Sequence, residues 1–335
     1  MFITLIYIYR GGCGIVWLAC NKINKTECAV KQISKKGNTL FTSNNLSIAK
    51  NEIDILTALT NTTSLYPSNN VIKIYSSYED KNDIWFSFEK GGKSLSSLSY
   101  KIKGSFLKSE RIYIIQKGEF IKLLFANLTH FKFLIKQLLT GLNFIHNEGI
   151  IHADIKPENI LIEYTTMPSF TITNVKIIDF GSAFYASNPS NINSNTPEYL
   201  SPEMTEVVEG KNKKSFLKDL IKYNSCIDIW SLGITLLELI IMCPVWMSYK
   251  AEVIINGKRS FGFGLFGFKG RDCKKIHQKQ LEVVSGLKGI VDRSIMGIFP
   301  EEEKEKFVDL LSKMLNVNYK ERITPQEALQ HCFLN

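Results

Sequence analysis

One short stretch of this chain restricts its fold more than any other, the run 151–161 (IHADIKPENIL). In it Asp154, Lys156 and Asn159 stand at fixed intervals between apolar segments typical of short strands, and Asp179 opens a second motif (DFG) twenty residues after Asn159. Carboxylate and amide oxygens are ligands that Mg²⁺ prefers, and a carboxylate can also accept a proton from an attacking hydroxyl. The pattern predicts a fold that gathers these side chains around a phosphate group and a metal ion.

Two glycine-rich stretches are candidates for a loop that covers phosphate. Residues 9–19 (YRGGCGIVWLA) have the pattern strand, glycine turn, strand, in which backbone N–H groups can approach phosphate oxygens without a side-chain clash. Residues 262–267 (GFGLFG) fit the G-x-G-x-x-G template better, but no lysine-bearing strand follows them. The first stretch is followed by a predicted strand, 28–31, whose Lys31 stands seventeen residues after Gly14. This context favours the first stretch, with Lys31 as a partner for phosphate.

A helix is predicted over residues 46–59, where apolar side chains recur at helical spacing. Asn45 precedes this segment as the expected N-cap. Glu52 and Leu56 lie four residues apart and therefore share one face of the helix. Because this face carries apolar residues, we expect it to turn inward and to bring Glu52 towards Lys31.

The strand pattern gives way to a mainly helical pattern near residue 90. Two strands, 71–78 and 84–88, are predicted on either side of a polar turn, and residues 89–93 (EKGGK) then break the pattern. We expect this break to be the hinge between a β-rich lobe and an α-rich lobe, with a cleft beside it. Residues 101–122 carry six Lys or Arg against two Glu. They are predicted to be a solvated insertion, and recruitment of an acidic partner is the alternative.

Length and composition restrict the class of protein further. A chain of 335 residues is long for one compact core, so a two-lobed unit is expected, and its net charge of +9 is attributed to a solvated surface. The seven cysteines include no Cys-x-x-Cys pair, which favours reduced thiols in the cytosol or nucleus. The longest apolar run, 232–247, is interrupted by Glu238 and Pro244 and is predicted to be a buried helix. We expect no membrane association, no nucleic-acid binding and a monomer.

From about Ile6 to Phe333 the chain resembles the eukaryotic protein kinases, because the motifs described above occur in the order found in that family. The resemblance implies an α+β, bilobed fold. Residues 1–90 would form a small β-rich N-lobe, with a five-stranded sheet and one regulatory helix, and residues 91–335 a larger α-helical C-lobe. The matched motifs begin almost at Met1 and end near the last residue, so no additional regulatory domain is expected.

The resemblance also implies ATP and Mg²⁺ as cofactors, and it gives individual residues roles. Asp154 would be the catalytic base, Lys156 the cation near the transferred phosphoryl group, and Thr196 a third catalytic residue. Asn159 and Asp179 would hold Mg²⁺. The predicted nucleotide-binding residues are Gly11, Gly14, Val16, Ala29, Lys31, Glu52 (as the ion-pair partner of Lys31), Glu89 and Leu161 (under the adenine). Tyr9 stands where the first loop glycine of the family usually is.

Further motifs resemble the part of a protein kinase that holds a peptide substrate. Residues 196–203 (TPEYLSPE) are similar to the substrate platform, and Arg322 matches the arginine that pairs with its last residue, Glu203. Residues 228–233 (DIWSLG) are similar to the start of a helix that anchors the catalytic loop. Lys156 and Thr196 together favour Ser/Thr substrates. The motifs HADIKP and DFGSA are similar to those of kinases in the dual-specificity and splicing-factor branch.

Three positions at which family members often place a cation are uncharged here: Ala153, Phe184 and Ile48. A phosphate on the activation loop would therefore lack its usual charge-assisted hydrogen bonds. This implies a kinase that is active without activation-loop phosphorylation. Glu158 and Glu238 occupy places where some relatives bind a substrate arginine, and a preference for basic substrates is left open.

The function that these features favour is transfer of the γ-phosphate of ATP to Ser/Thr hydroxyls of protein substrates. The alternative is a pseudokinase scaffold that binds ATP and partners without catalysis, with Tyr9 as its one site-adjacent defect. A small-molecule kinase of related fold would lack the platform 196–203 and its Arg322 partner. A nucleic-acid-binding module has only the basic charge in its favour, without interleaved aromatic residues.

Overall fold

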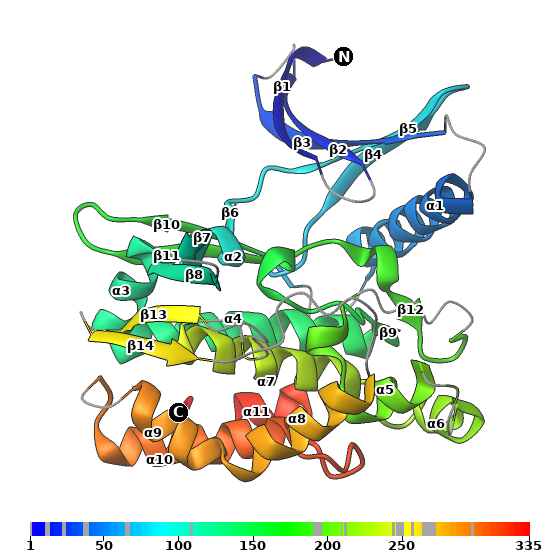
Figure 1. Ribbon diagram of the computed structural model, residues 1–335. Helices are drawn as coiled ribbons and strands as arrows, with labels where there is room; N and C mark the ends of the chain where they lie inside the picture. Colours follow the sequence, from blue (N-terminus) through cyan, green and yellow to red (C-terminus); the bar gives the residue numbers. More distant parts are fainter. Residues whose placement is uncertain are drawn as a thin grey trace.

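The computed structural model describes the chain except for residues 1, 11–13, 22–24, 36–39, 64–67, 108–109, 190–195, 209, 211–212, 243–244, 246–250, 256–257, 263–272 and 296–297. The fold is α+β and bilobed, with a sheet and one helix above a larger helical part (Figure 1). The upper sheet is antiparallel, with strand order β1-β2-β3-β5-β4. Its strands are β1 (Phe2–Arg10), β2 (Ile15–Asn21), β3 (Glu27–Ser34), β4 (Ile74–Glu79) and β5 (Asp83–Glu89).

Helix α1 (Leu40–Asn61) lies beside this sheet and carries Glu52. Its inward face is apolar, since Ala49 and Leu56 are fully buried, as predicted from the spacing. The predicted start was wrong, because the helix begins at Leu40 and Asn45 lies inside it. Asparagine is a common N-cap but is also tolerated within a helix, so the residue type alone did not locate the end.

The lower lobe is built around two long helices, α4 (Leu128–Asn147) and α7 (Cys226–Ile241). Residues 226–240 of α7 are all buried, which explains the long apolar run as a core helix. Among the helices in the described residues, none combines the length and hydropathy needed to cross a bilayer. The surrounding helices are α2 (Leu95–Ser99), α3 (Glu119–Ala126), α5 (Pro202–Val208), α6 (Lys213–Asp219), α8 (Cys273–Ser285), α9 (Leu287–Ser294), α10 (Glu301–Met314) and α11 (Pro325–Leu329).

A hairpin brings the two central motifs together. Strand β10 (Ile160–Thr165) follows the 151–161 run, strand β11 (Thr171–Ile177) precedes Asp179, and the two pair antiparallel with Ile160 opposite Ile177. The short strand β6 (Lys93–Ser94) joins the other edge of β10. A second short pair, β9 (Ile150–Ile151) with β12 (Phe184–Tyr185), links the segment before the first motif to the segment after the second.

Two insertions form an additional four-stranded sheet on the lower lobe, with strand order β14-β13-β8-β7. The first contributes β7 (Tyr100–Leu107) and β8 (Glu110–Lys117), and the second contributes β13 (Ala251–Ile255) and β14 (Lys258–Gly262). Strands β8 and β13 pair in parallel, although they are far apart in the sequence. Within the described part of 101–122, this segment forms β7, β8 and the start of α3, a regular structure that the sequence did not indicate; that it is solvated, or binds an acidic partner, stays a prediction. The second glycine stretch begins at the end of β14, and residues 263–267 lie outside the described part.

Candidate active site

Four of the predicted site residues meet at the catalytic loop. The Lys156 ammonium donates to Asp154 Oδ2 at 2.6 Å and to Thr196 Oγ1 at 2.7 Å, and Thr196 Oγ1 donates to Asp154 Oδ1 at 2.8 Å. The Asn159 amide nitrogen donates to Asp154 Oδ2 at 3.0 Å and to the Asp154 carbonyl at 2.8 Å. The Asp154 carboxylate is thus held in a fixed orientation by an ammonium, a hydroxyl and an amide.

The loop that carries Asp154 is fixed from below by helix α7. Asp228, fully buried in the first turn of α7, accepts hydrogen bonds from the backbone N–H groups of His152 and Ala153, both at 2.8 Å. The ring of His146 also lies 2.8 Å from this carboxylate. Burial works to raise the pKa of Asp228, but the contacts with His146 and the loop outweigh it and leave the pKa below its ordinary value. The expected role of residues 228–233 as an anchor for the loop is confirmed by this geometry.

Lys31 joins the upper sheet to helix α1 and to the second motif. Its ammonium lies 2.6 Å from Glu52 Oε2 and 3.5 Å from Asp179 Oδ1. The Glu52 side chain is only 2% exposed, and burial raises its pKa to about 7, although the Lys31 charge acts in the opposite direction. The Asp179 side chain is 45% exposed, and the ammonium of Lys31 is the main cause that lowers its pKa. A buried pair next to a more exposed carboxylate is suited to a charged ligand beside Asp179.

The two groups of residues form one site. The Lys156 charge also lowers the pKa of Asp179, so it acts across the space between the catalytic loop and the second motif. The backbone connects them as well, because Ile178 N–H donates to the Asn159 carbonyl at 3.0 Å. Asp179 has a φ of +67°, and Ala153 has a φ of +62°. Non-glycine residues in this left-handed region are uncommon and cluster where a fold holds functional groups in place.

The remaining predicted nucleotide residues in the described part lie on or next to strands of the upper sheet and beside the hinge. Val16 pairs with Lys31 across β2 and β3, and Ala29 pairs with Phe88 across β3 and β5. Leu161 pairs with Ser94, next to the hinge. Gly14 approaches the neighbouring strand so closely that a Cβ there would lie 2.4 Å from a backbone oxygen of β3. Gly11 lies outside the described residues.

Glu89 uses its side chain for structure. Its carboxylate lies 2.9 Å from the buried ammonium of Lys176, and it accepts from the Lys73 backbone N–H at 2.8 Å. Its backbone N–H donates to the Lys73 carbonyl. The side chain and the backbone N–H of Glu89 therefore both have protein partners. No sequence pattern indicated its partner Lys176, which precedes Asp179 by three residues.

The donor set fits Mg²⁺. Both side-chain hydrogen bonds of Asn159 to Asp154 use its amide nitrogen, so the amide oxygen is the atom that could ligate a metal. Asp179 supplies a carboxylate that stays ionised, because its pKa is lowered. Oxygen ligands from one amide and one carboxylate, with phosphate oxygens and water completing the shell, are typical of Mg²⁺ bound with a nucleotide. No group of three or more His, Cys, Asp or Glu side chains able to hold a metal occurs in the described part of the chain.

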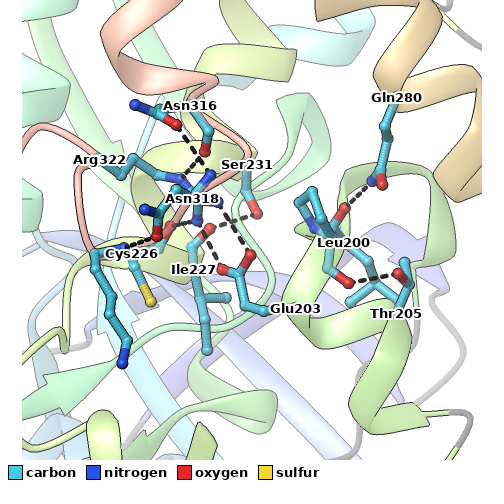
Figure 2. Close-up of polar contacts among 12 residues, drawn as sticks. Leu200, Glu203, Thr205, Cys226, Ile227, Ser231, Gln280, Asn316, Asn318 and Arg322 are labelled. Carbon is cyan, nitrogen blue, oxygen red and sulfur yellow. Dashed lines mark hydrogen bonds and ion pairs between the residues drawn. The ribbon is translucent and has the colours of Figure 1, made fainter. Parts of the chain in front are cut away.

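The predicted pair of Arg322 with Glu203 is confirmed as a bidentate contact (Figure 2). The two guanidinium nitrogens lie 2.7 and 3.0 Å from the two carboxylate oxygens, with the arginine side chain fully buried. The guanidinium also donates to the Cys226 carbonyl at 2.6 Å and lies 5.1 Å from the Trp230 ring centroid. Ser231 Oγ, on α7, donates to the Tyr199 carbonyl at 2.8 Å, so α7 contacts the segment 196–203 directly as well as through Arg322.

The comparisons with known proteins agree with this arrangement. A model of the protein kinase domain matches residues 5–334, and the chain therefore belongs to the protein kinase domain family. A calcium-dependent protein kinase 3 of Plasmodium berghei is 28% identical over 96% of this chain and 44% of its own length. A protein named as a probable serine/threonine-protein kinase of Dictyostelium discoideum is 30% identical over 77% of this chain and 50% of its own length.

A solved kinase-domain structure superposes with a TM-score of 0.61 at 20% identity, and covers 100% of this chain and 95% of that chain. This likeness establishes the fold. The chain spans about half the length of the curated relatives it matches.

Proposed function

We propose that this chain is a serine/threonine protein kinase, which transfers the γ-phosphate of ATP to hydroxyl groups of protein substrates. The observation that carries the proposal is the Asp154 carboxylate, which is bound by Lys156 and Thr196 and linked through Asn159 to the backbone next to Asp179. Phosphoryl transfer requires mainly positioning and charge neutralisation, and these side chains supply both. The name of the Dictyostelium discoideum relative, a probable serine/threonine-protein kinase, supports the Ser/Thr assignment.

In this mechanism Asp154 receives the substrate hydroxyl. Its carboxylate accepts the hydroxyl hydrogen bond and takes the proton as the oxygen attacks phosphorus. Lys156 lies 2.6 Å from this carboxylate and would move its charge towards the transferred group. Thr196 donates to the same carboxylate and ties the substrate platform to it.

Lys31 would position the nucleotide, with Glu52 fixing its ammonium. Asn159 and Asp179 are the residues that would hold Mg²⁺, which neutralises phosphate charge when bound. Residues Val16, Ala29 and Leu161 would enclose the adenine, and the backbone carbonyl of Glu89 would face its edge. Because all of these groups are present, the pseudokinase alternative has only Tyr9 in its favour.

We further propose that activity does not require phosphorylation of the activation loop. Ala153 and Phe184 are 8% and 4% exposed and belong to one apolar cluster with Ile151 and Leu200. At the third position, Ile48 packs on the motif itself, since a Cβ at Gly181 would lie 2.7 Å from its Cγ2 atom. An apolar cluster offers no hydrogen-bond donors to a phosphate. Hydrophobic burial would order the start of the loop in place of charge pairing.

One further contact supports this proposal. Asn51, one residue before Glu52 on helix α1, donates through its amide to the Ala183 carbonyl at 2.8 Å. Helix α1 is thereby tied to the start of the loop by a neutral hydrogen bond. The position of Glu52 beside Lys31 then depends on packing and this bond, and not on a phosphate.

The test of kinase activity is transfer of radiolabel from [γ-³²P]ATP by the purified chain to a mixed panel of peptides. The expected result is labelling of Ser and Thr peptides that depends on Mg²⁺. Binding of Mg-ATP without any transfer, to peptides or to the chain itself, would support the pseudokinase scaffold instead.

The test of loop independence uses the same assay before and after phosphatase treatment. We expect kcat to change by less than about twofold, and a variant with Ser187, Ser190 and Ser194 replaced by alanine to match it. A loss of tenfold or more in both samples would contradict the proposal. We also propose that the chain is a monomer, which the elution volume of the purified chain tests. Labelling of its thiols tests the proposal that the cysteines are reduced, as in an intracellular protein.

A further inference from the structure

The partners of Glu238 on helix α7 differ from those of the other buried glutamates. Glu238 is only 5% exposed, yet among the described residues both of its carboxylate oxygens accept hydrogen bonds from tyrosine hydroxyls. Tyr199 donates to Oε2 at 2.6 Å, and Tyr100 donates to Oε1. Glu52 and Glu203, by contrast, each meet a lysine or an arginine. A buried carboxylate with two neutral partners keeps a strong attraction for a cation.

Glu238 is linked to Asp154, the expected position of the acceptor hydroxyl, through Tyr199 and Thr196. Tyr199 is one helical turn from Thr196, to whose carbonyl its N–H donates at 3.2 Å, and Thr196 in turn contacts Asp154. A peptide whose hydroxyl reaches Asp154 therefore passes close to Tyr199 and Glu238.

A second acid, Glu158, belongs to the same region. It stands four residues after Asp154, in the turn Pro157–Asn159, and its charge contributes to raising the pKa of Glu238 to about 7, for which burial is the main cause. Ser96 Oγ donates to Glu158 at 3.0 Å. Glu238 and Glu158 thus both accept hydrogen bonds from hydroxyl groups.

The hydroxyls of Ser96 and Tyr100 come from one continuous segment. Ser96 lies on α2, and Tyr100 follows the end of α2 as the first residue of β7. Strand β7 belongs to the four-stranded sheet made by the two insertions. That sheet therefore fixes the strand from which Tyr100 reaches Glu238.

We propose that Tyr100 is a specificity-determining residue, which occupies Oε1 of Glu238 and closes this carboxylate to the guanidinium or ammonium group of a basic substrate residue. The proposal rests on the kinase function proposed above and names its substrate class as peptides without a required basic residue near the acceptor. A guanidinium binds a carboxylate best through both oxygens at once, and both are taken here. Entry of an arginine would require loss of the Tyr100 hydrogen bond and displacement of its ring.

The experiment compares acceptor preferences in a degenerate peptide library labelled with [γ-³²P]ATP. The wild type is compared with Tyr100→Ala and Tyr100→Leu, which both remove the hydroxyl, the second with retention of an apolar side chain at the start of β7. Tyr78→Ala is the matched control, because Tyr78 is a 65% exposed tyrosine on β4. Thermal unfolding of each variant shows whether it is folded. If Tyr100→Ala is unfolded, the result of Tyr100→Leu decides.

The wild type and Tyr78→Ala are expected to select Arg or Lys by less than about twofold at every position. The Tyr100 variants are expected to gain a preference of roughly tenfold for a basic residue, as one charge-assisted contact would give. Adding Glu238→Gln to the Tyr100 variant should abolish the gain.

An unchanged preference in both Tyr100 variants would overturn the proposal while leaving the kinase function intact. A wild type that already selects arginine, and loses this selection with Glu238→Gln, would also overturn it. A wild type that labels no peptide at all would contradict the kinase function, and this proposal with it.

Discussion

Replacement of Arg322 by methionine should destabilise the lower lobe strongly, since it would leave the Glu203 carboxylate buried without its cation. The arginine side chain is fully buried and the Glu203 side chain is 6% exposed, so water cannot replace the lost partner. Methionine keeps much of the volume and apolar packing next to Trp230. The change therefore isolates the loss of charge and hydrogen bonds.

The magnitude follows from the contacts that are lost. Removal of one partner from a buried ion pair costs about 3–5 kcal/mol. The Cys226 and Asn316 carbonyls, which accept from the guanidinium at 2.6 and 3.0 Å, would also lose a donor. We expect the free energy of unfolding to fall by at least about 3 kcal/mol. A double variant, Arg322→Met with Glu203→Gln, should recover part of the loss, because the unpaired charge is gone.

The assay is equilibrium unfolding in urea followed by circular dichroism. Lys320→Met is the matched control: its ammonium lies 2.9 Å from Asp219 in a pair that is 48% and 28% exposed, so it should change stability by less than about 1 kcal/mol. Equal, small effects of Arg322→Met and Lys320→Met would refute the reasoning that this pair holds the substrate platform to α7.

Two further predictions concern buried glutamates. Glu52→Gln removes the charge opposite Lys31, and we expect kcat/KM for ATP to fall roughly tenfold or more with little change in circular dichroism; an unchanged kcat/KM would show that the pair does not position Lys31. Burial raises the pKa of Glu238 from 4.5 to about 7, so between these values the folded chain holds a proton that the unfolded chain has released. The free energy of unfolding of the wild type, measured relative to that of Glu238→Gln, should fall as pH rises from 4.5 to 7, by at most about 1.4 kcal/mol per pH unit, and stay level above pH 7. If urea titrations give the wild type and Glu238→Gln the same pH dependence across this range, the raised pKa of Glu238 is contradicted.

Most of the candidate site could be predicted from sequence motifs, because local turns and one hairpin set the positions of its side chains. Asp154, Lys156 and Asn159 lie on one loop, and their spacing brings them together through local turns. The link to Asp179 follows from the β10–β11 hairpin, whose strands are apolar and close in sequence. The fold class followed in the same way from the change of period near residue 90.

The additional sheet could not be predicted in this way. Its strands β8 and β13 come from two insertions that are distant in sequence, and the many lysines in residues 101–122 resemble a solvated loop. The contact of Tyr100 with Glu238 depends on that sheet, so no local pattern indicated it. Likewise, Lys176 gave no signal as a partner of Glu89, since pairing between β-strands of different sheets is set by packing.

The proposed function requires that Lys31, Asp154 and Asp179 act on one nucleotide. The most direct measurement is kcat for peptide phosphorylation by the purified wild type, Asp154→Asn and Asp179→Asn, with Asp54→Asn, an exposed aspartate of α1, as the control. We predict that both site variants lower kcat by a factor on the order of 10² or more while remaining folded, and that the control does not. Turnover like that of the wild type in either folded site variant would contradict the claim.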